Sequence, residues 1–331
     1  MTKKLNIIIP VYNGATYLAR GLDAVLNQKN INNNDIELTL INDGSKDNSL
    51  EILNHYKNEY PDVVRLIDQQ NMGAAKSRNK GIGLSSAEYT TFLDQDDYVD
   101  SDYIEKLLGA ITVGDFDMVQ SGFKLTNKSG KVIKTILPIN TEFGRLLAIP
   151  AWAKIYRTTF LKENNITFFD NNIGEDSIFT IKAILSTKKY GTIQYAGYNN
   201  SFDNEESVTN TLHKGLSKTV NIEGLIDEMY GVKSTDARTQ KLLEYNIIRT
   251  CAYYLLSYGK YATPARFKEE YRNLFGWLEK NIPSFGSNSF IWKKPKGEVL
   301  SASMGIKLLV ILHGIRAVPL FAKFYSKGEQ K

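Results

Sequence analysis

The sequence contains little of the chemistry that defines several common protein classes. Only one of its 331 residues is cysteine, Cys251, so no disulfide can form within the chain, which fits a reducing compartment such as the cytoplasm. The three histidines, His55, His213 and His313, are scattered without the spacing of zinc ligands, which argues against a zinc site. No uncharged apolar run reaches the roughly 20 residues that a membrane-spanning helix needs. The apolar run at residues 5–10 is too short for a signal peptide.

An excess of charge of one sign is also absent from most of the chain. The net charge is +5, but residues 290–331 hold eight Lys or Arg and two Glu, so the other residues sum to about −1. We therefore expect no basic surface of the kind that binds nucleic acid on the body of the protein, and no nucleic-acid partner. The basic character belongs to the C-terminal tail.

The first hundred residues alternate between two hydrophobic patterns. Short apolar runs rich in β-branched residues predict strands at 5–10, 36–41, 63–67 and 89–93. Between them, apolar residues at helical spacing predict helices at 16–28, 50–60 and 74–84. Strands that alternate with helices form βαβ units, whose crossovers are right-handed and whose sheet is mainly parallel. We therefore expect an α/β fold.

A polar cluster follows each of these four strands, at residues 10–14, 42–45, 69–73 and 94–97. Ligands of open parallel sheets bind at the carboxyl ends of the strands. Four clusters at one edge of one sheet would build one site, whereas the alternative is four unrelated surface loops. The regular alternation of strands and helices favours the single site.

The last cluster is the most acidic, with Asp94, Asp96 and Asp97 directly after a short apolar run. Hard divalent cations such as Mg²⁺ and Mn²⁺ bind one or two carboxylates together with substrate phosphates. The cluster therefore predicts a metal-assisted site for a phosphorylated substrate. The alternative is an acidic turn that caps the following helix, since Asp is common in turns and at N-caps.

Beyond residue 100 the pattern is less regular. It predicts strands at 118–123 and 132–136 joined by a hairpin turn, a short helix at 158–164, and a helix that opens at 174–177 and runs to about residue 185. From residue 214 onward it becomes helical, with predicted helices at 216–230, 239–258, 265–282 and 301–327. Within the last of these, Pro319 is expected to kink or stop the helix.

Six segments resemble, in their order along the chain, the inverting nucleotide-sugar glycosyltransferases of family 2, which have the GT-A fold. They are residues 7–13, 40–47, 71–79, 92–97, 152–156 and 174–179. The resemblance covers roughly residues 4–210, and six motifs in order are far more specific than any single one. It implies a mainly parallel, Rossmann-like sheet flanked by helices. The catalytic domain would span residues 1–212, and a helical C-terminal region residues 213–331.

The resemblance also implies which residues bind the donor, a nucleotide-diphosphate sugar that is most often a UDP-sugar. The backbone near Tyr12 and the carboxylate of Asp43 would hold the base, because a carboxylate accepts the imide N–H of uracil. Lys76 and Arg78 would lie near the ribose and diphosphate, although both could instead lie on a solvated helix face. The implied donor-binding residues are Pro10, Val11, Tyr12, Asn13, Asp43, Asn71, Lys76, Arg78, Asp94, Gln95 and Asp96.

Residues 94–96 occupy the position of the family's D-x-D motif. The resemblance implies that Asp96 binds the metal cofactor, Mn²⁺ or Mg²⁺, and that Asp94 contacts the ribose or a metal-bound water. Many relatives have Ser where this chain has Gln95, and the larger side chain could alter the sugar pocket. His213 could contact the diphosphate, as a His or Arg after the catalytic region sometimes does in the family.

Asp176 matches the family's general base, which takes a proton from the acceptor hydroxyl during a single in-line displacement at the anomeric carbon. An α-linked donor would give a β-linked product. Trp152, Lys154 and Glu175 match the region that contacts sugar or acceptor, with Trp152 as a stacking surface. Each has a structural alternative, since Trp152 could belong to the core and Glu175 and Asp176 could only start a helix.

The implied function is glycosyl transfer to a glycan or lipid-linked acceptor during the synthesis of cell-surface polysaccharide, teichoic acid or capsule. A nucleotidyltransferase that activates a sugar phosphate remains the alternative. Against it, the loop at residues 10–14 is not the Gly-rich basic loop expected for that class. A dehydrogenase is disfavoured because no G-x-G-x-x-G motif follows the first strand.

The apolar and basic tail has two interpretations. Residues 301–327 could attach the protein peripherally to an anionic membrane, which would suit a lipid-linked acceptor and a location at the inner face of the cell membrane. Alternatively, the tail packs on its own domain or on another subunit of a homo-oligomer.

Overall fold

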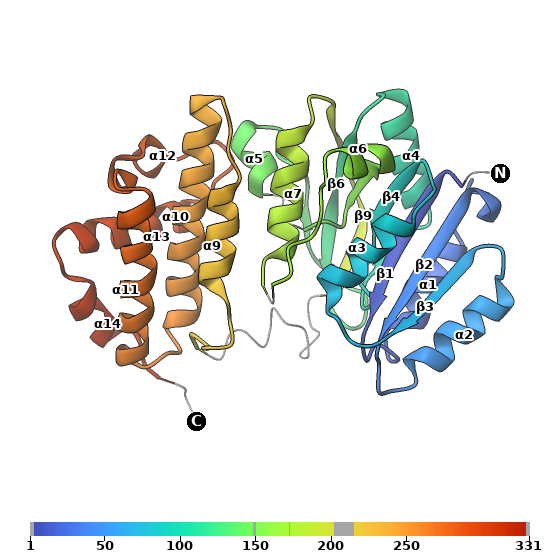
Figure 1. Ribbon diagram of the computed structural model, residues 1–331, viewed down its shortest axis with the longest axis horizontal. Coiled ribbons are helices and arrows are strands. Elements are labelled where there is room, and N and C mark those ends of the chain that lie inside the picture. Colours follow the sequence, from blue (N-terminus) through green and yellow to red (C-terminus); the bar gives the residue numbers. More distant parts are fainter. Residues whose placement is uncertain (1–2, 148–149, 172, 202–214, 329–331) are drawn as a thin grey trace. The chain divides into compact units, whose positions relative to one another are not determined.

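The computed structural model describes residues 3–147, 150–171, 173–201 and 215–328 of the chain. They fall into two compact units (Figure 1). The first comprises Met1–Asn140, Ala148–Asp170 and Glu175–Asn204, and it contains the sheet. The second comprises Thr141–Leu147, Asn171–Gly174 and Glu205–Lys331, and its described part is helical. No helix in the described ranges is long and apolar enough to cross a membrane.

The first unit is built on a nine-stranded sheet in the order β3-β2-β1-β4-β8-β6-β9-β5, with β7 paired to β6. Strands β1 to β4 are parallel to one another, β8 is antiparallel to β4 and β6, and β9 is parallel to β6. The predicted α/β class with a mainly parallel sheet is confirmed. The strands are β1 Leu5–Val11, β2 Ile36–Asp43, β3 Val64–Gln69, β4 Tyr89–Phe92, β5 Tyr98–Val99, β6 Met118–Thr126, β7 Val132–Ile136, β8 Lys154–Arg157 and β9 Tyr190–Ser201.

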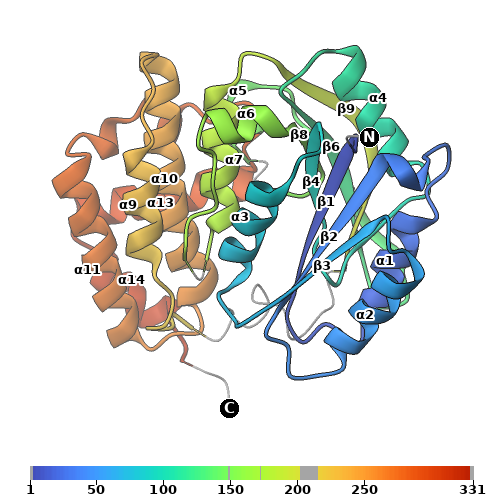
Figure 2. The same cartoon turned by 45° about the vertical axis from the view of Figure 1, so that its right-hand side comes forward.

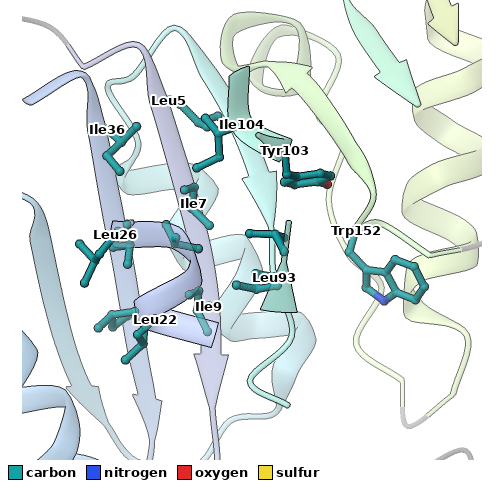
Figure 3. Packing of buried hydrophobic residues seen from close by; sticks show 14 of the residues in the cluster. Leu5, Ile7, Ile9, Leu22, Leu26, Ile36, Leu93, Tyr103, Ile104 and Trp152 are labelled. Atoms are coloured by element: carbon teal, nitrogen blue, oxygen red, sulfur yellow. The ribbon is translucent and has the colours of Figure 1, made fainter. Parts of the chain in front are cut away.

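Helices cover both faces of this sheet (Figure 2). They are α1 Leu18–Leu26, α2 Ser49–Glu59, α3 Ala74–Leu84, α4 Tyr103–Val113, α6 Thr158–Glu163 and α7 Glu175–Ser186, with a 3-10 turn, η1, at Asn33–Asp35. Side chains alternate across the buried strand β1, because successive residues of a strand point to opposite faces. Leu5, Ile7 and Ile9 pack with the apolar face of α1 (Figure 3), whereas Ile8 belongs to the cluster that includes α3, α6 and α7.

The second unit is organised around the long helix α10 (Ala237–Gly259), which buries Tyr245, Cys251 and Leu255. Capping residues define two of its helices. Asp236 accepts the N–H of Thr239 at the start of α10, and Thr263 caps α11, whose first residue is Pro264. The remaining elements are α5 Glu142–Leu147, α9 Ile222–Gly231, α11 Pro264–Asn281, η2 Phe285–Ser287, α12 Ser289–Trp292, α13 Leu300–Gly314 and α14 Val318–Tyr325.

The structure corrects the predicted elements at several places. The single helix predicted over residues 301–327 is two helices, with α14 beginning at Val318 and Pro319 in its first turn, where proline is tolerated. The pattern missed α4, α5, β5, β8 and β9. The twelve residues of β9 show no regular alternation of burial, and the strand pairs with β6 over most of its length and with β5 near its end.

Candidate active site

The loops after β1, β2, β3 and β4 lie at one edge of the sheet and are joined by hydrogen bonds. Gln95 links the first to the last: its Oε1 accepts the N–H of Tyr12 at 2.8 Å, and its Nε2 donates to the Tyr12 carbonyl at 3.1 Å. The next link is Asn13, which donates its N–H to Ser45 Oγ at 3.1 Å and accepts the N–H of Lys46 at 2.8 Å. Gln95 therefore fixes the loop after β1.

Asp43, the last residue of β2, connects its strand to the loop after β3. Its Oδ1 accepts from Gln69 Nε2 at 2.8 Å and from the N–H of Met72 at 2.9 Å, and its Oδ2 accepts the N–H of Gly73 at 2.8 Å. The side chain is 3% exposed. A carboxylate has about four acceptor positions, so these three bonds leave capacity for one further donor. Together these bonds join all four polar clusters at one edge.

The loops on either side of Asp43 each carry an exposed apolar side chain. Tyr12 follows β1 and is 44% exposed, and Met72 follows β3 and is 50% exposed. Asn71, beside Met72, is also exposed. Pro10 and Val11 are the last residues of β1 and are buried.

The three carboxylates after β4 have three different environments. Asp97 is 1% exposed and accepts from Tyr198 Oη at 2.7 Å, from Asn200 Nδ2 at 3.1 Å and from the N–H of Ser201 at 2.8 Å. Burial and the nearby carboxylates of Asp94 and Asp96 raise the pKa of Asp97 well above its ordinary value. Asp97 therefore anchors the acidic turn to the end of β9, and it does not cap the following helix.

Tyr198 contacts the acidic turn and is itself packed against Trp152. The Tyr198 hydroxyl also accepts the N–H of Asp94 at 3.2 Å, and its ring stacks on that of Trp152 with centroids 4.4 Å apart and planes 8° apart. Trp152 is 8% exposed and belongs to the hydrophobic core (Figure 3). One face of its indole is covered by Tyr198, so its position does not support the predicted sugar-stacking role.

Arg78, on α3, brings Asp94 together with the start of α7. Its Nη2 donates to Asp94 Oδ1 at 2.7 Å, and its Nη1 lies 3.3 Å from Glu175 Oε1 and 3.5 Å from Asp176 Oδ1. The sequence places these residues up to 98 positions apart, and the fold gathers them around one guanidinium group. The predicted base and the first residue of the D-x-D motif therefore belong to one site.

Asp176 has the environment of a group that changes its protonation state near neutral pH. Burial, partly offset by the charge of Arg78, raises the pKa of Asp176 to about 7, and the carboxylates of Glu175 and Asp94 add to the rise. Its Oδ2 accepts the N–H of Ala151 at 3.2 Å. Among the described residues, no group donates a hydrogen bond to its Oδ1.

The two predicted lysine contacts differ in their surroundings. Lys76 is 45% exposed and pairs with Asp170 at 2.7 Å, so a bound ligand would share the ammonium group with that carboxylate or replace it. Lys154, the first residue of β8, is 2% exposed and its Nζ donates to the Pro150 carbonyl. Burial lowers the pKa of Lys154 to about 7. Its position inside the unit does not support the predicted phosphate or acceptor contact.

The donors at this edge fit a hard divalent cation that is held mainly by its substrate. Asp96 is partly exposed, Asp97 binds β9 and Asp94 binds Arg78. Within the described ranges, no group of three or more His, Cys, Asp or Glu side chains is arranged to hold a metal. Mg²⁺ and Mn²⁺ commonly take one or two carboxylates and complete their coordination shell with phosphate oxygens and water. A single carboxylate at this edge is therefore enough for such a site.

Residues of β9 are the part of the site that the sequence did not reveal. Tyr198, Asn200 and Ser201 contact Asp97 across a separation of at least 101 positions. The pattern around residues 190–201 gave no strand, so nothing indicated that this segment returns beneath the acidic turn. His213, the predicted diphosphate contact, lies outside the described residues.

Comparison with known proteins places this geometry in a family. Residues 6–172 match the sequence model of glycosyl transferase family 2. A poly(ribitol-phosphate) beta-glucosyltransferase of Bacillus spizizenii is 32% identical over 192 residues, which cover 56% of this chain and 30% of that protein. The chain thus spans less than a third of the length of that relative. An uncharacterized glycosyltransferase of Haemophilus influenzae is 30% identical over 234 residues, which cover 70% of this chain and 91% of that protein.

A solved structure shows the same fold. Residues 1–349 of TarS from S. aureus, in complex with UDP-GlcNAc, match with a TM-score of 0.72 at 19% identity, covering 95% of this chain and 92% of that one. This likeness confirms the predicted fold class. Together with the match over residues 6–172 and the Haemophilus relative, it leads to one conclusion: the chain belongs to glycosyl transferase family 2.

Proposed function

We propose that the chain is a metal-dependent inverting glycosyltransferase that moves a sugar from a UDP-sugar to a hydroxyl of a cell-surface glycan or lipid-linked acceptor. The observation that carries this proposal is the cluster at the strand edge. There Arg78 holds Asp94 of the D-x-D motif and Asp176 together, and the pKa of Asp176 is raised to about 7. A carboxylate with a pKa near the working pH is suited to general-base catalysis.

The donor would bind across the loops after β1, β2 and β3. The free acceptor capacity of Asp43 suits the imide N–H of uracil, and the exposed faces of Tyr12 and Met72 suit a planar base. Lys76, near the start of α3, would approach the diphosphate after leaving Asp170. The TarS structure with UDP-GlcNAc supports a UDP-sugar as the donor class.

Asp96 would hold Mn²⁺ or Mg²⁺ with the diphosphate oxygens. The bound metal would supply positive charge to the departing nucleoside diphosphate. Gln95 would act indirectly, because its side chain fixes the backbone of Tyr12. Asp94 would contact the donor while remaining paired with Arg78.

Asp176 would take the proton from the acceptor hydroxyl as the acceptor oxygen forms its bond to the anomeric carbon. The bond from that carbon to the diphosphate oxygen breaks in the same step, and the nucleoside diphosphate leaves with the electron pair. A single displacement inverts the anomeric centre. Glu175 is a second carboxylate beside Arg78, 24% exposed at its side chain, and would face the acceptor.

Relatives that act on poly(ribitol-phosphate) support a polyol-phosphate or related surface polymer as the acceptor class. The test is to incubate the protein with UDP-sugars, Mn²⁺ and such a polymer and to identify the nucleotide product. Release of UDP with sugar on the polymer is the expected result. Release of pyrophosphate from UTP and a sugar phosphate would instead support the alternative nucleotidyltransferase.

A peripheral membrane contact is a further part of the proposal, and it would place the protein at the inner face of the cell membrane. Five apolar side chains, each at least 43% exposed, follow one another every three or four residues along α13 and its C-cap. They are Leu300, Met304, Leu308, Ile311 and Ile315. The spacing puts all five on one face of the helix, opposite the buried Ile306 and Leu309.

Charge around this helix is complementary to an anionic lipid surface. Residues 293–328 contain seven Lys or Arg and a single acidic residue, Glu298, whose side chain is fully buried against Arg249. Apolar insertion together with basic residues is the usual basis of peripheral binding to anionic membranes. A second copy of the chain is the alternative occupant of the same face.

Vesicle sedimentation tests this contact. The protein is expected to bind vesicles with about one third anionic lipid and not neutral vesicles, and Leu308→Glu with Ile311→Glu is expected to abolish binding. Val113→Glu is the matched control, because Val113 is apolar and 90% exposed in the first unit. Unchanged binding of the double variant would refute the contact, as would a wild-type dimer that the double variant alone disrupts.

A further inference from the structure

Arg78 is a buried cation at the centre of the carboxylate cluster. It is 5% exposed, and both terminal nitrogens of its guanidinium group face carboxylates, from Asp94 after β4 and from Glu175 and Asp176 of α7. The ring of Phe168 lies 5.3 Å from its central carbon and covers the group further. Its Nε has no hydrogen-bond partner among the described residues. The guanidinium group of Arg78 is therefore buried inside the first unit, against the carboxylates of Asp94, Glu175 and Asp176.

This arrangement differs from that of a residue that binds phosphate. A phosphate-binding arginine presents two parallel N–H groups to its ligand, whereas here Nη2 is engaged by Asp94 at 2.7 Å and Nη1 lies between two carboxylates. One positive charge beside three negative groups leaves the cluster with an excess of negative charge. A diphosphate that displaced these carboxylates would leave them buried without their counter-ion, which is costly.

We infer that Arg78 is a positioning residue that fixes Asp94 and Asp176 relative to each other and keeps Asp176 in its basic form. This inference rests on the proposed function, in which Asp176 removes the proton of the acceptor. It assigns the diphosphate to other cations of the site and gives Arg78 no contact with the substrate. Its effect is exerted through the two carboxylates that it holds.

The charges around Asp176 support this role and set the sign of the test. Its neighbours are Arg78 on α3, Asp94 after β4, Glu175 on its own helix, and Lys154 and Tyr156 on β8. Arg78 lowers the pKa of Asp176, whereas Glu175 and Asp94 raise it. Removing Arg78 should therefore raise the pKa, so that a higher pH is needed to form the base.

The experiment measures two quantities for wild type, Arg78→Gln and Arg78→Lys: the affinity for UDP with Mn²⁺ by calorimetry, and the pH profile of kcat/KM. We expect Arg78→Gln to change the UDP affinity by no more than about threefold. The acidic limb of the kcat/KM profile of this variant should move to higher pH by about one unit. At pH values below the limb, this shift is a tenfold loss of kcat/KM. Arg78→Lys should restore part of that shift. Lys80→Gln, on the exposed side of the same helix, should change neither quantity.

Two results would overturn the inference. If Arg78→Gln lowers the UDP affinity thirtyfold or more and leaves the acidic limb of the pH profile in place, Arg78 is a phosphate ligand. If the variant changes neither the affinity nor the limb, Arg78 has no role in setting the protonation of Asp176. If Arg78→Gln does not fold, Glu175→Gln tests the same cluster, and its limb should move to lower pH. Absence of sugar transfer by wild type would refute the proposed function itself, before any variant is compared.

Discussion

At the scale of single residues, a buried acid, Asp176, and a buried base, Lys154, each have a pKa of about 7. Burial raises the pKa of Asp176 and lowers that of Lys154. The folded protein therefore holds an extra proton on Asp176 between about pH 4 and 7, so this group makes stability fall as the pH rises through that range. Lys154 binds fewer protons in the folded state between about pH 7 and 10, so it makes stability rise there.

Lys154→Met is expected to remove the second of these trends. The free energy of unfolding of wild type should increase between pH 7 and 9.5 by about 1–3 kcal/mol, and in the variant this increase should be largely absent. Urea unfolding at the two pH values measures it. The comparison avoids higher pH, where tyrosines begin to ionise. An equal increase in both proteins would show that Lys154 is not the titrating group.

Part of the site could be predicted from residue types, and the rest depends on burial, which only the structure shows. The sequence predicted that Asp94 and Asp176 belong to one site, and the structure gathers both around Arg78, whereas the roles of Asp96 and Asp176 stay predictions. The role of Asp97 could not be predicted, because its partners on β9 lie more than a hundred positions away. Trp152 and Lys154 have side chains suited to ligands, and only the structure shows that both are buried.

At the scale of elements, the packing of α3 on β1 sets where Arg78 lies. Gly81, three residues beyond Arg78 on the same helix, lies against Ile8 of β1, and a Cβ atom there would be 2.6 Å from Ile8 Cγ2. That distance is far shorter than a van der Waals contact. The absence of a side chain at position 81 therefore lets the helix approach the sheet.

Gly81→Ala and Gly83→Ala should have opposite effects. The first should destabilise the protein by about 1–3 kcal/mol, because the new methyl group overpacks the helix–strand contact. The second has no neighbour within 4 Å, so alanine should stabilise the helix by about 0.5–1 kcal/mol. Chemical denaturation of the two variants measures both. A stabilising Gly81→Ala would show that α3 does not lie this close to β1.

Element prediction succeeded where the hydrophobic period was clear and unbroken. The strands and helices of the first hundred residues agree with the structure to within about two residues at most ends, and β1, β2 and β4 are buried along almost their whole length. It failed for β8 and β9, whose positions in the sheet are set by pairing with β6 rather than by their own pattern. The break between α13 and α14 lies before Pro319, as the sequence indicated.

At the scale of the whole molecule, the strand order β3-β2-β1-β4 places all four polar loops on neighbouring strands. That the four loops share one edge follows from the parallel βαβ connections, which the alternation of strands and helices predicts. What covers the exposed apolar face of the C-terminal helices was not predictable, because helical periodicity indicates an apolar face without indicating its contact.

A donor that binds only the folded protein should raise its melting temperature. At about one hundred times its dissociation constant, a UDP-sugar with Mn²⁺ stabilises by about 2.7 kcal/mol, which corresponds to a shift of about 5 °C. Asp96→Ala should lose the part of the shift that depends on metal and keep the rest. A shift of equal size in wild type and variant would remove Asp96 from the metal site.

The most direct test of the central claim, that Asp176 is the base of a transfer from a nucleotide sugar, compares Asp176→Asn with wild type on the same donor and acceptor. Calorimetry measures donor affinity, and UDP release measures turnover. We predict affinity within about threefold of wild type and turnover reduced by about 10²–10⁴-fold, the usual contribution of a general base. Turnover equal to that of wild type in Asp176→Asn would contradict the account.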